Sequence, residues 1–148
     1  ILRYLWGTYG QAPFRPDDAG DRAVVDVWAE WGKHVLCGAF TVPVFWAHWR
    51  TPEEDRDRAA VAAAVARFEA LLEIVAPRID RGGFVVGDRL SLADIWVGHV
   101  LYRYFTLDIE RAAPPAIEAY YRRLCDRPGY ATHVMVNYDE LKGVRRSG

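Results

Sequence analysis

The chain has 148 residues, a length at which one domain buries an apolar core without metal or disulfide support. Hydrophobic residues make up 51% of the sequence and aromatic residues 14%, which excludes a disordered tail and indicates large buried surfaces. The 19 Lys and Arg residues nearly balance the 20 Asp and Glu residues, so no net positive field is available to attract nucleic acid or an anionic membrane. We therefore predict a folded domain with no nucleic-acid partner.

Several patterns that would indicate a membrane, an export signal or a metal are missing from the sequence. It has no run of about 18 apolar residues and no charged leader before an apolar stretch, so we expect no membrane association and a cytoplasmic location. Cys37 and Cys125 match no metal or redox spacing, which predicts two free thiols in a reducing compartment. The histidines lack metal-binding spacing too, so we expect no metal site: His34, His48, His99 and His133.

The N-terminal residues divide into a short helical segment and a linker. Residues 1–6 have the pattern of the end of an amphipathic helix, and the first residue is Ile rather than Met, so we expect the chain to be a fragment of a longer protein. Residues 7–20 contain three glycines and two prolines with few apolar anchors, which predicts a linker. The main body is then residues 21–148.

A first long helix is predicted over residues 21–50. Its apolar residues recur at spacings of four, three and four, the period of a helix with one buried face: Val24, Trp28, Trp31 and Val35. Pro43 lies inside this helix, where it cannot donate to the carbonyl four residues earlier. We therefore expect a kink over residues 39–43.

A second long helix is predicted to begin at Thr51, with Thr51 as its cap, Pro52 in the first turn and Glu54 closing a capping box. Its apolar stripe alternates spacings of four and three: Val61, Val65, Phe68, Leu72, Val75 and Ile79. We expect Pro77 to bend or end this helix. The apolar run 84–86 that follows is too short to predict a strand.

The start of a third, central helix is encoded by three local signals. Ser91 is placed to cap the first turn, Asp94 to reach back to the amide of Ser91, and Leu90 to pack on Ile95 as a hydrophobic staple. Although a hydroxyl and a carboxylate at this spacing resemble catalytic groups, we interpret them as a folding device. Residues 95–105 are apolar almost all round, which predicts that this helix is central to the core.

Two shorter helices complete the predicted fold. Pro114 and Pro115 open a fourth helix and Pro128 opens a fifth, since proline is favoured in the first turn of a helix. Helices joined by short breaks, without alternating strands, predict an all-α bundle of about five helices.

The order of these elements resembles the glutathione transferase superfamily, whose second domain is a helical bundle that follows a thioredoxin-like domain. The most specific shared string is residues 87–94, which is similar to the capping box and staple at the start of the family's central helix. Residues 1–5 are similar to the end of the last helix of the first domain, and residues 124–128 to the turn into a late helix. By this resemblance, residues 1–6 are the tail of a thioredoxin-like domain and residues 21–148 are the C-terminal domain of a bacterial-type member.

The resemblance implies a glutathione transferase that conjugates the glutathione thiolate to apolar electrophiles, with glutathione as co-substrate bound mainly by the first domain. This chain would supply the wall of the electrophile site and contacts of a homodimer. It would contain no catalytic residue, because the family's activating Tyr, Ser or Cys lies before the position of Ile1. Two alternatives of the same fold remain open: a non-catalytic interaction module, and a glutathione-dependent disulfide reductase or peroxidase.

Candidate substrate-binding residues gather at the predicted kink. Phe40, Thr41 and Val44 offer a ring, a hydroxyl and a branched apolar group, a mixture suited to apolar ligands. Arg103 is an isolated cation in the most apolar helix and requires a carboxylate, carbonyls or an anionic ligand. The resemblance places Phe40, Thr41 and Arg103 on the walls of the acceptor pocket, and we add Cys37 as a further wall residue. The alternatives are that Phe40 packs in the core and that Arg103 pairs with an acidic neighbour.

Overall fold

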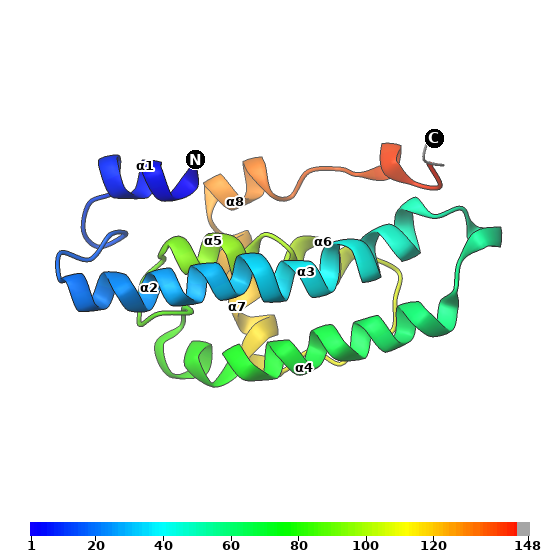
Figure 1. Ribbon diagram of the computed structural model, residues 1–148, viewed down its shortest axis with the longest axis horizontal. Coiled ribbons are helices and arrows are strands. Elements are labelled where there is room, and N and C mark those ends of the chain that lie inside the picture. The colour runs from blue at the N-terminus through cyan, green and yellow to red at the C-terminus, as the bar shows by residue number, and fades with distance from the viewer. Residues whose placement is uncertain (145–148) are drawn as a thin grey trace.

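The computed structural model describes residues 1–144, and that range contains helices and no strand, which confirms the predicted all-α class. The elements in chain order are α1 (Leu2–Tyr9), α2 (Ala19–Trp31), η1 (Gly32–Leu36), α3 (Cys37–Phe40), η2 (Thr41–Arg50), η3 (Glu53–Asp55), α4 (Arg58–Gly82), α5 (Leu92–Gly98), α6 (Leu101–Thr106), α7 (Pro115–Cys125), α8 (Pro128–His133) and η4 (Asp139–Leu141) (Figure 1). Within residues 1–144, none of these helices is both long enough and apolar enough to cross a bilayer.

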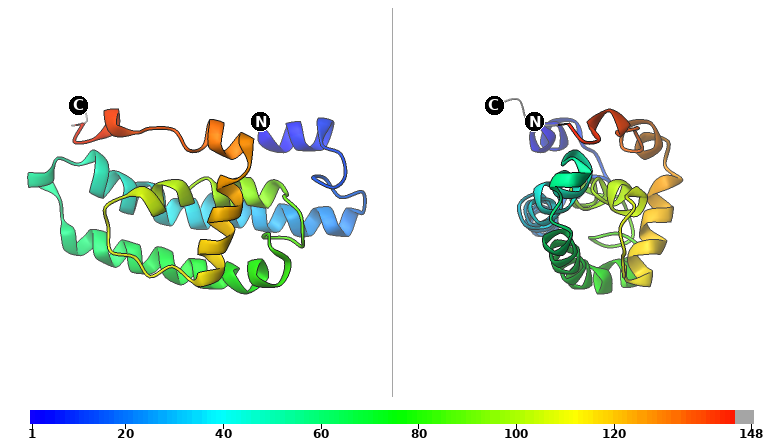
Figure 2. Two further views of the ribbon diagram at one scale, coloured as in Figure 1. Left: turned by 180° about the vertical axis from the view of Figure 1, so that it is seen from behind. Right: turned by 90° about the vertical axis from the view of Figure 1, so that its right-hand side faces the viewer.

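The helices form a bundle around α5 and α6. The run from α2 to η2 and helix α4 lie alongside each other, α7 crosses the bundle and packs on α4, and α5 with α6 lies between α7 and the first long helix (Figures 1 and 2). Helices α1 and α8 lie on the same side of the bundle, where the N-terminus is also found. The central position predicted for residues 95–105 is therefore confirmed.

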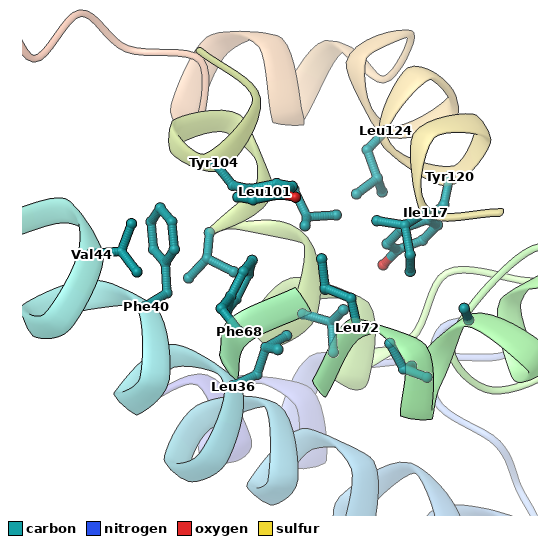
Figure 3. Close-up of a cluster of buried hydrophobic side chains, with 14 of the residues drawn as sticks. Leu36, Phe40, Val44, Phe68, Leu72, Leu101, Tyr104, Ile117, Tyr120 and Leu124 are labelled. Carbon is teal, nitrogen blue, oxygen red and sulfur yellow. The ribbon is translucent and has the colours of Figure 1, made fainter. Parts of the chain in front are cut away.

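The main core collects large side chains from α3, α4, α6 and α7 (Figure 3). The ring centroids of Phe40 and Phe68 are 4.9 Å apart, and those of Phe68 and Tyr104 are 5.1 Å apart. Ile117 and Leu124 close the core from α7. A smaller cluster joins α1 to the bundle, where Trp6, Val25, Ala29 and Leu92 are buried together.

The first long helix is continuous from Ala19 to Arg50 but changes its hydrogen-bonding period three times. Segments η1 and η2 are π-helical, so their backbone bonds span one residue more than those of an α-helix. The second π-helical segment begins at Thr41, within the range where a kink is predicted, and the kink itself stays a prediction. Pro43 lies in its first turn, and because proline has no N–H it cannot close an α-helical bond to Ala39.

The buried face of this helix differs from the predicted one. Val24 and Val35 are 41% and 42% exposed, whereas Val25 and Ala29 are each 1% exposed and Leu36 is fully buried. The predicted face was therefore wrong by about one residue along the helix.

Close packing of the first long helix on α5 accounts for this shift. A Cβ atom built on Gly32 would lie 3.1 Å from the Cβ of Trp96 and 3.1 Å from Cγ2 of Val97, so only a small residue fits there. Trp28 and Trp31, which were predicted to face the core, are half-buried at its margin, with ring centroids 5.3 Å apart. Small residues thus form the contact, and the large ones border it.

The second long helix begins later than predicted. Asp57 is its cap, because the Asp57 carboxylate accepts a hydrogen bond of 2.9 Å from the amide of Ala60, and α4 starts at Arg58. The prediction that Thr51 caps this helix is wrong. The Thr51 hydroxyl donates to the carbonyl of Trp46 at 3.0 Å and so closes the preceding helix.

The apolar stripe predicted for this helix is confirmed, because its six residues are all buried: Val61, Val65, Phe68, Leu72, Val75 and Ile79. The helix passes through Pro77 and continues to Gly82, so Pro77 does not end it. Its end is at Gly83, whose φ of 87° lies in the left-handed region that glycine adopts without strain.

The predicted third helix is present as two consecutive pieces. Helix α5 begins after the cap Ser91, and a turn at His99 and Val100 separates it from α6. Helices α7 and α8 begin with Pro115 and Pro128, as predicted from their prolines.

Candidate functional site

The predicted capping box at the start of α5 is present, and its carboxylate also accepts hydrogen bonds from residues outside that helix. The carboxylate of Asp94 accepts hydrogen bonds from the amide of Ser91 at 2.8 Å and from its hydroxyl at 2.9 Å. It also accepts from the amide of Val85 and from the hydroxyl of Tyr120, both at 2.9 Å. Asp94 is 2% exposed and its four donors come from three separate segments, so its role is to join those segments.

The electrostatics of this group agree with a structural role. Burial raises the pKa of Asp94, and the hydrogen bonds from Val85, Ser91 and Tyr120 act against that rise. The two residues of the predicted staple lie against different clusters, Leu90 against the main core and Ile95 against the smaller one. The staple itself stays a prediction.

Arg103 is the predicted site residue with the most distinctive surroundings. Its guanidinium carbon lies 5.0 Å from the ring centroid of Phe45 and 5.9 Å from that of Tyr138. Its Nε is buried and has no hydrogen-bond partner among residues 1–144, and no ion pair within that range includes it. The acidic neighbour considered for Arg103 is thus absent from the described chain.

Cys37 lies close to a histidine but in an environment that keeps its thiol neutral. Its Sγ donates to the carbonyl of Trp96 at 3.4 Å and lies 3.8 Å from Nε2 of His99. Burial raises the pKa of the Cys37 thiol to about 12. Burial lowers the pKa of His99, and the charge of Arg103 lowers it further. A neutral thiol beside a neutral imidazole is not an activated nucleophile.

Phe40 and Val44 have a packing role in the structure. Phe40 is 1% exposed and packs on Phe68 and Tyr104, and Val44 is fully buried, so neither side chain offers a surface to a ligand in this arrangement. Of the predicted wall residues, Thr41 and Arg103 remain partly exposed together with Cys37. The core alternative considered for Phe40 is the arrangement found here.

Two surface grooves lie near the end of η2 and the start of α4, and neither includes a predicted site residue. The smaller, of about 500 Å³, is lined by residues including Trp46, Arg50 and Thr51. The larger, of about 880 Å³, lies between α4 and residues 108–112 and is lined by both basic and acidic side chains. Residues 1–144 contain no cluster of three His, Cys, Asp or Glu side chains able to hold a metal ion.

Sequence reasoning missed the contribution of Tyr138. This residue is 7% exposed, its carbonyl accepts from Nε1 of Trp49 at 3.0 Å, and its hydroxyl lies 2.7 Å from that of Thr106. Its ring also packs against Phe45 with centroids 5.3 Å apart. The available signal was an isolated aromatic residue in the polar segment after the last predicted helix.

Comparison with known proteins gives consistent matches. A family model described as "Glutathione S-transferase, C-terminal domain" matches residues 33–128. Glutathione S-transferase GstB of Escherichia coli K12 is 28% identical over 136 residues, and the match covers 92% of this chain and 65% of that protein. The chain therefore spans about two thirds of the length of the curated relatives it matches.

Solved structures with the same arrangement of helices include a theta class glutathione S-transferase from Xanthomonas axonopodis pv. citri with glutathione bound. It is 35% identical, with a TM-score of 0.84, and the match covers 93% of this chain and 71% of that one. A glutathione S-transferase from Rhodospirillum rubrum is 20% identical with a TM-score of 0.75 over 96% of this chain and 66% of that one, which supports the fold alone.

Proposed function

Because the chain belongs to the glutathione S-transferase family as its C-terminal helical domain, we propose that its parent conjugates the thiol of glutathione to apolar electrophiles. In this proposal the chain supplies the wall of the electrophile site and part of a dimer interface. The observation that carries the proposal is the 35% identity, over 93% of the chain, to a transferase whose structure holds glutathione.

The proposal assigns activation of the thiol to a preceding thioredoxin-like domain. Glutathione must lose its thiol proton to become a good nucleophile at neutral pH. Cys37 and His99 place a thiol beside an imidazole, with Sγ 3.8 Å from Nε2, and burial holds both in their neutral forms. This electrostatic setting supports a division in which the helical domain binds the acceptor and does not activate the thiol.

Exposed apolar side chains on the first long helix support the proposed homodimer. Val24, Val35 and Val42 are 41%, 42% and 55% exposed, and Ile74 on the neighbouring helix α4 is 53% exposed. Exposed branched apolar side chains on two adjacent helices are suited to an isologous interface, in which a two-fold axis brings the same surface of a second copy against the first.

The test compares the present chain with its full-length parent. Isothermal titration with glutathione and an absorbance assay of conjugation to a chlorodinitrobenzene are run on both. We expect turnover by the parent and neither binding nor turnover by the chain alone. Tight glutathione binding by the chain alone would contradict the division of labour. A parent that binds glutathione but reduces mixed disulfides instead of conjugating would favour the reductase alternative, and a parent inactive in both assays would favour the interaction module.

A further inference from the structure

The guanidinium of Arg103 is held in place without an acidic partner. Helix α6 carries it to a position beside Phe45 of η2 and Tyr138 of the C-terminal segment, whose rings pack on each other, so that its positive charge faces both rings. Contacts of this kind fix the orientation of a guanidinium but leave its N–H donors free. The buried Nε has no partner among residues 1–144, and the side chain as a whole is partly exposed.

The groups around Arg103 do not neutralise its charge. One turn earlier on the same side, His99 is kept neutral by burial and by the charge of Arg103 itself, and Cys37 beside His99 is a neutral thiol. On the other side, the Tyr138 hydroxyl is engaged with Thr106. Within the described chain, no negatively charged side chain pairs with the guanidinium of Arg103.

We propose that Arg103 makes the acceptor site selective for electrophiles that carry a carboxylate. A planar guanidinium presents paired donors that match the two oxygens of a carboxylate, and contact with the ring pair reduces the side-chain entropy that binding would otherwise cost. The inference rests on the proposed transferase function and names the substrate class of that function. An acceptor that bears an anionic group at one end and the reactive carbon at the other would be oriented by this contact.

The kinetic test compares wild type with variants of the full-length parent on a charged and an uncharged electrophile, a chloronitrobenzoate and its methyl ester. We expect Arg103→Gln to lower kcat/KM for the carboxylate about ten- to a hundredfold, the range for loss of a charge-assisted hydrogen bond, and to change kcat/KM for the ester by less than about threefold. Arg103→Lys, which keeps the charge but loses the paired donors, should fall between Gln and wild type. Equal losses on both substrates, or no loss on either, would overturn the proposal.

Two further measurements separate this proposal from its alternatives. Arg123→Gln is a control, because Arg123 also lies over a ring, at 5.6 Å from the centroid of Phe84, but donates to the carbonyl of Gly83 and contacts neither Phe45 nor Tyr138 in the described chain; it should leave the selectivity unchanged. Equilibrium binding of unreactive nitrobenzoate and nitrobenzamide is measured by quenching of tryptophan fluorescence. If the parent conjugates nothing, the proposed function fails, whereas the inference fails when wild type binds nitrobenzoate no more tightly than nitrobenzamide, or when Arg103→Gln keeps that preference.

Discussion

Replacing Asp94 with Ala should destabilise the domain far more than removal of an ordinary helix cap. The change leaves the amide of Val85 and the hydroxyl of Tyr120 without an acceptor, and both residues are fully buried. Each buried donor left unsatisfied costs about 1–3 kcal/mol, and the lost cap costs about 1 kcal/mol more. We therefore expect Asp94→Ala to lower the free energy of unfolding by about 3–7 kcal/mol.

The assay is urea unfolding followed by tryptophan fluorescence, with two matched variants. Ser91→Ala removes the cap hydroxyl and its hydrogen bond to Asp94, leaves the other three donors in place, and should cost about 1 kcal/mol. Tyr120→Phe removes one donor together with its need for a partner, so a double-mutant cycle with Asp94→Ala isolates their coupling, and an interaction energy of about 1–2 kcal/mol is expected. If Asp94→Ala costs no more than Ser91→Ala, the four-donor arrangement does not hold the three segments together.

Three further predictions concern the buried residues Phe40 and His99 and the exposed residue Val35. Phe40→Ala should lower the free energy of unfolding by about 3–5 kcal/mol. An unchanged melting temperature with altered acceptor selectivity would instead show that Phe40 lines the ligand site. Since the folded pKa of His99 lies below its usual 6.5, neutral His99 adds stability above that pH, and we expect the free energy of unfolding to fall as the pH drops from about 7 toward the lower folded pKa. His99→Gln should reduce this pH dependence in melts at several pH values, and an undiminished slope would assign it to other groups. Val35→Glu should convert the proposed full-length dimer to monomer in light scattering, and a dimer that persists would place the interface elsewhere.

The features that sequence predicted correctly are local ones. The capping box of Ser91 and Asp94 and the apolar stripe of α4 each depend on residues within a few positions, where spacing alone determines which groups meet. The start of α4 shows the limit of this reasoning. Thr51 and Asp57 are both good caps, and the choice between them depended on the contact of Thr51 with the preceding helix, which spacing does not reveal.

The first long helix could not be placed correctly because its large residues are not its most buried ones. A prediction from hydrophobic periodicity places the buried face of the helix on its large apolar residues, here Trp28 and Trp31. The close contact with α5 is made instead through Ala29 and Gly32, which are too small to contribute much to that pattern. The isolation of Arg103 in an apolar helix was visible in the sequence. Its ring partners were not, because Phe45 and Tyr138 lie far from it along the chain.

The π-helical stretches in the first long helix matter for how homologues should be aligned. A π-helical turn contains one residue more than an α-helical turn, so a relative can lose a residue there and still connect the same ends. For a relative that has one residue fewer here, an alignment that forbids gaps inside helices would shift the register by one position and compare side chains that face different directions.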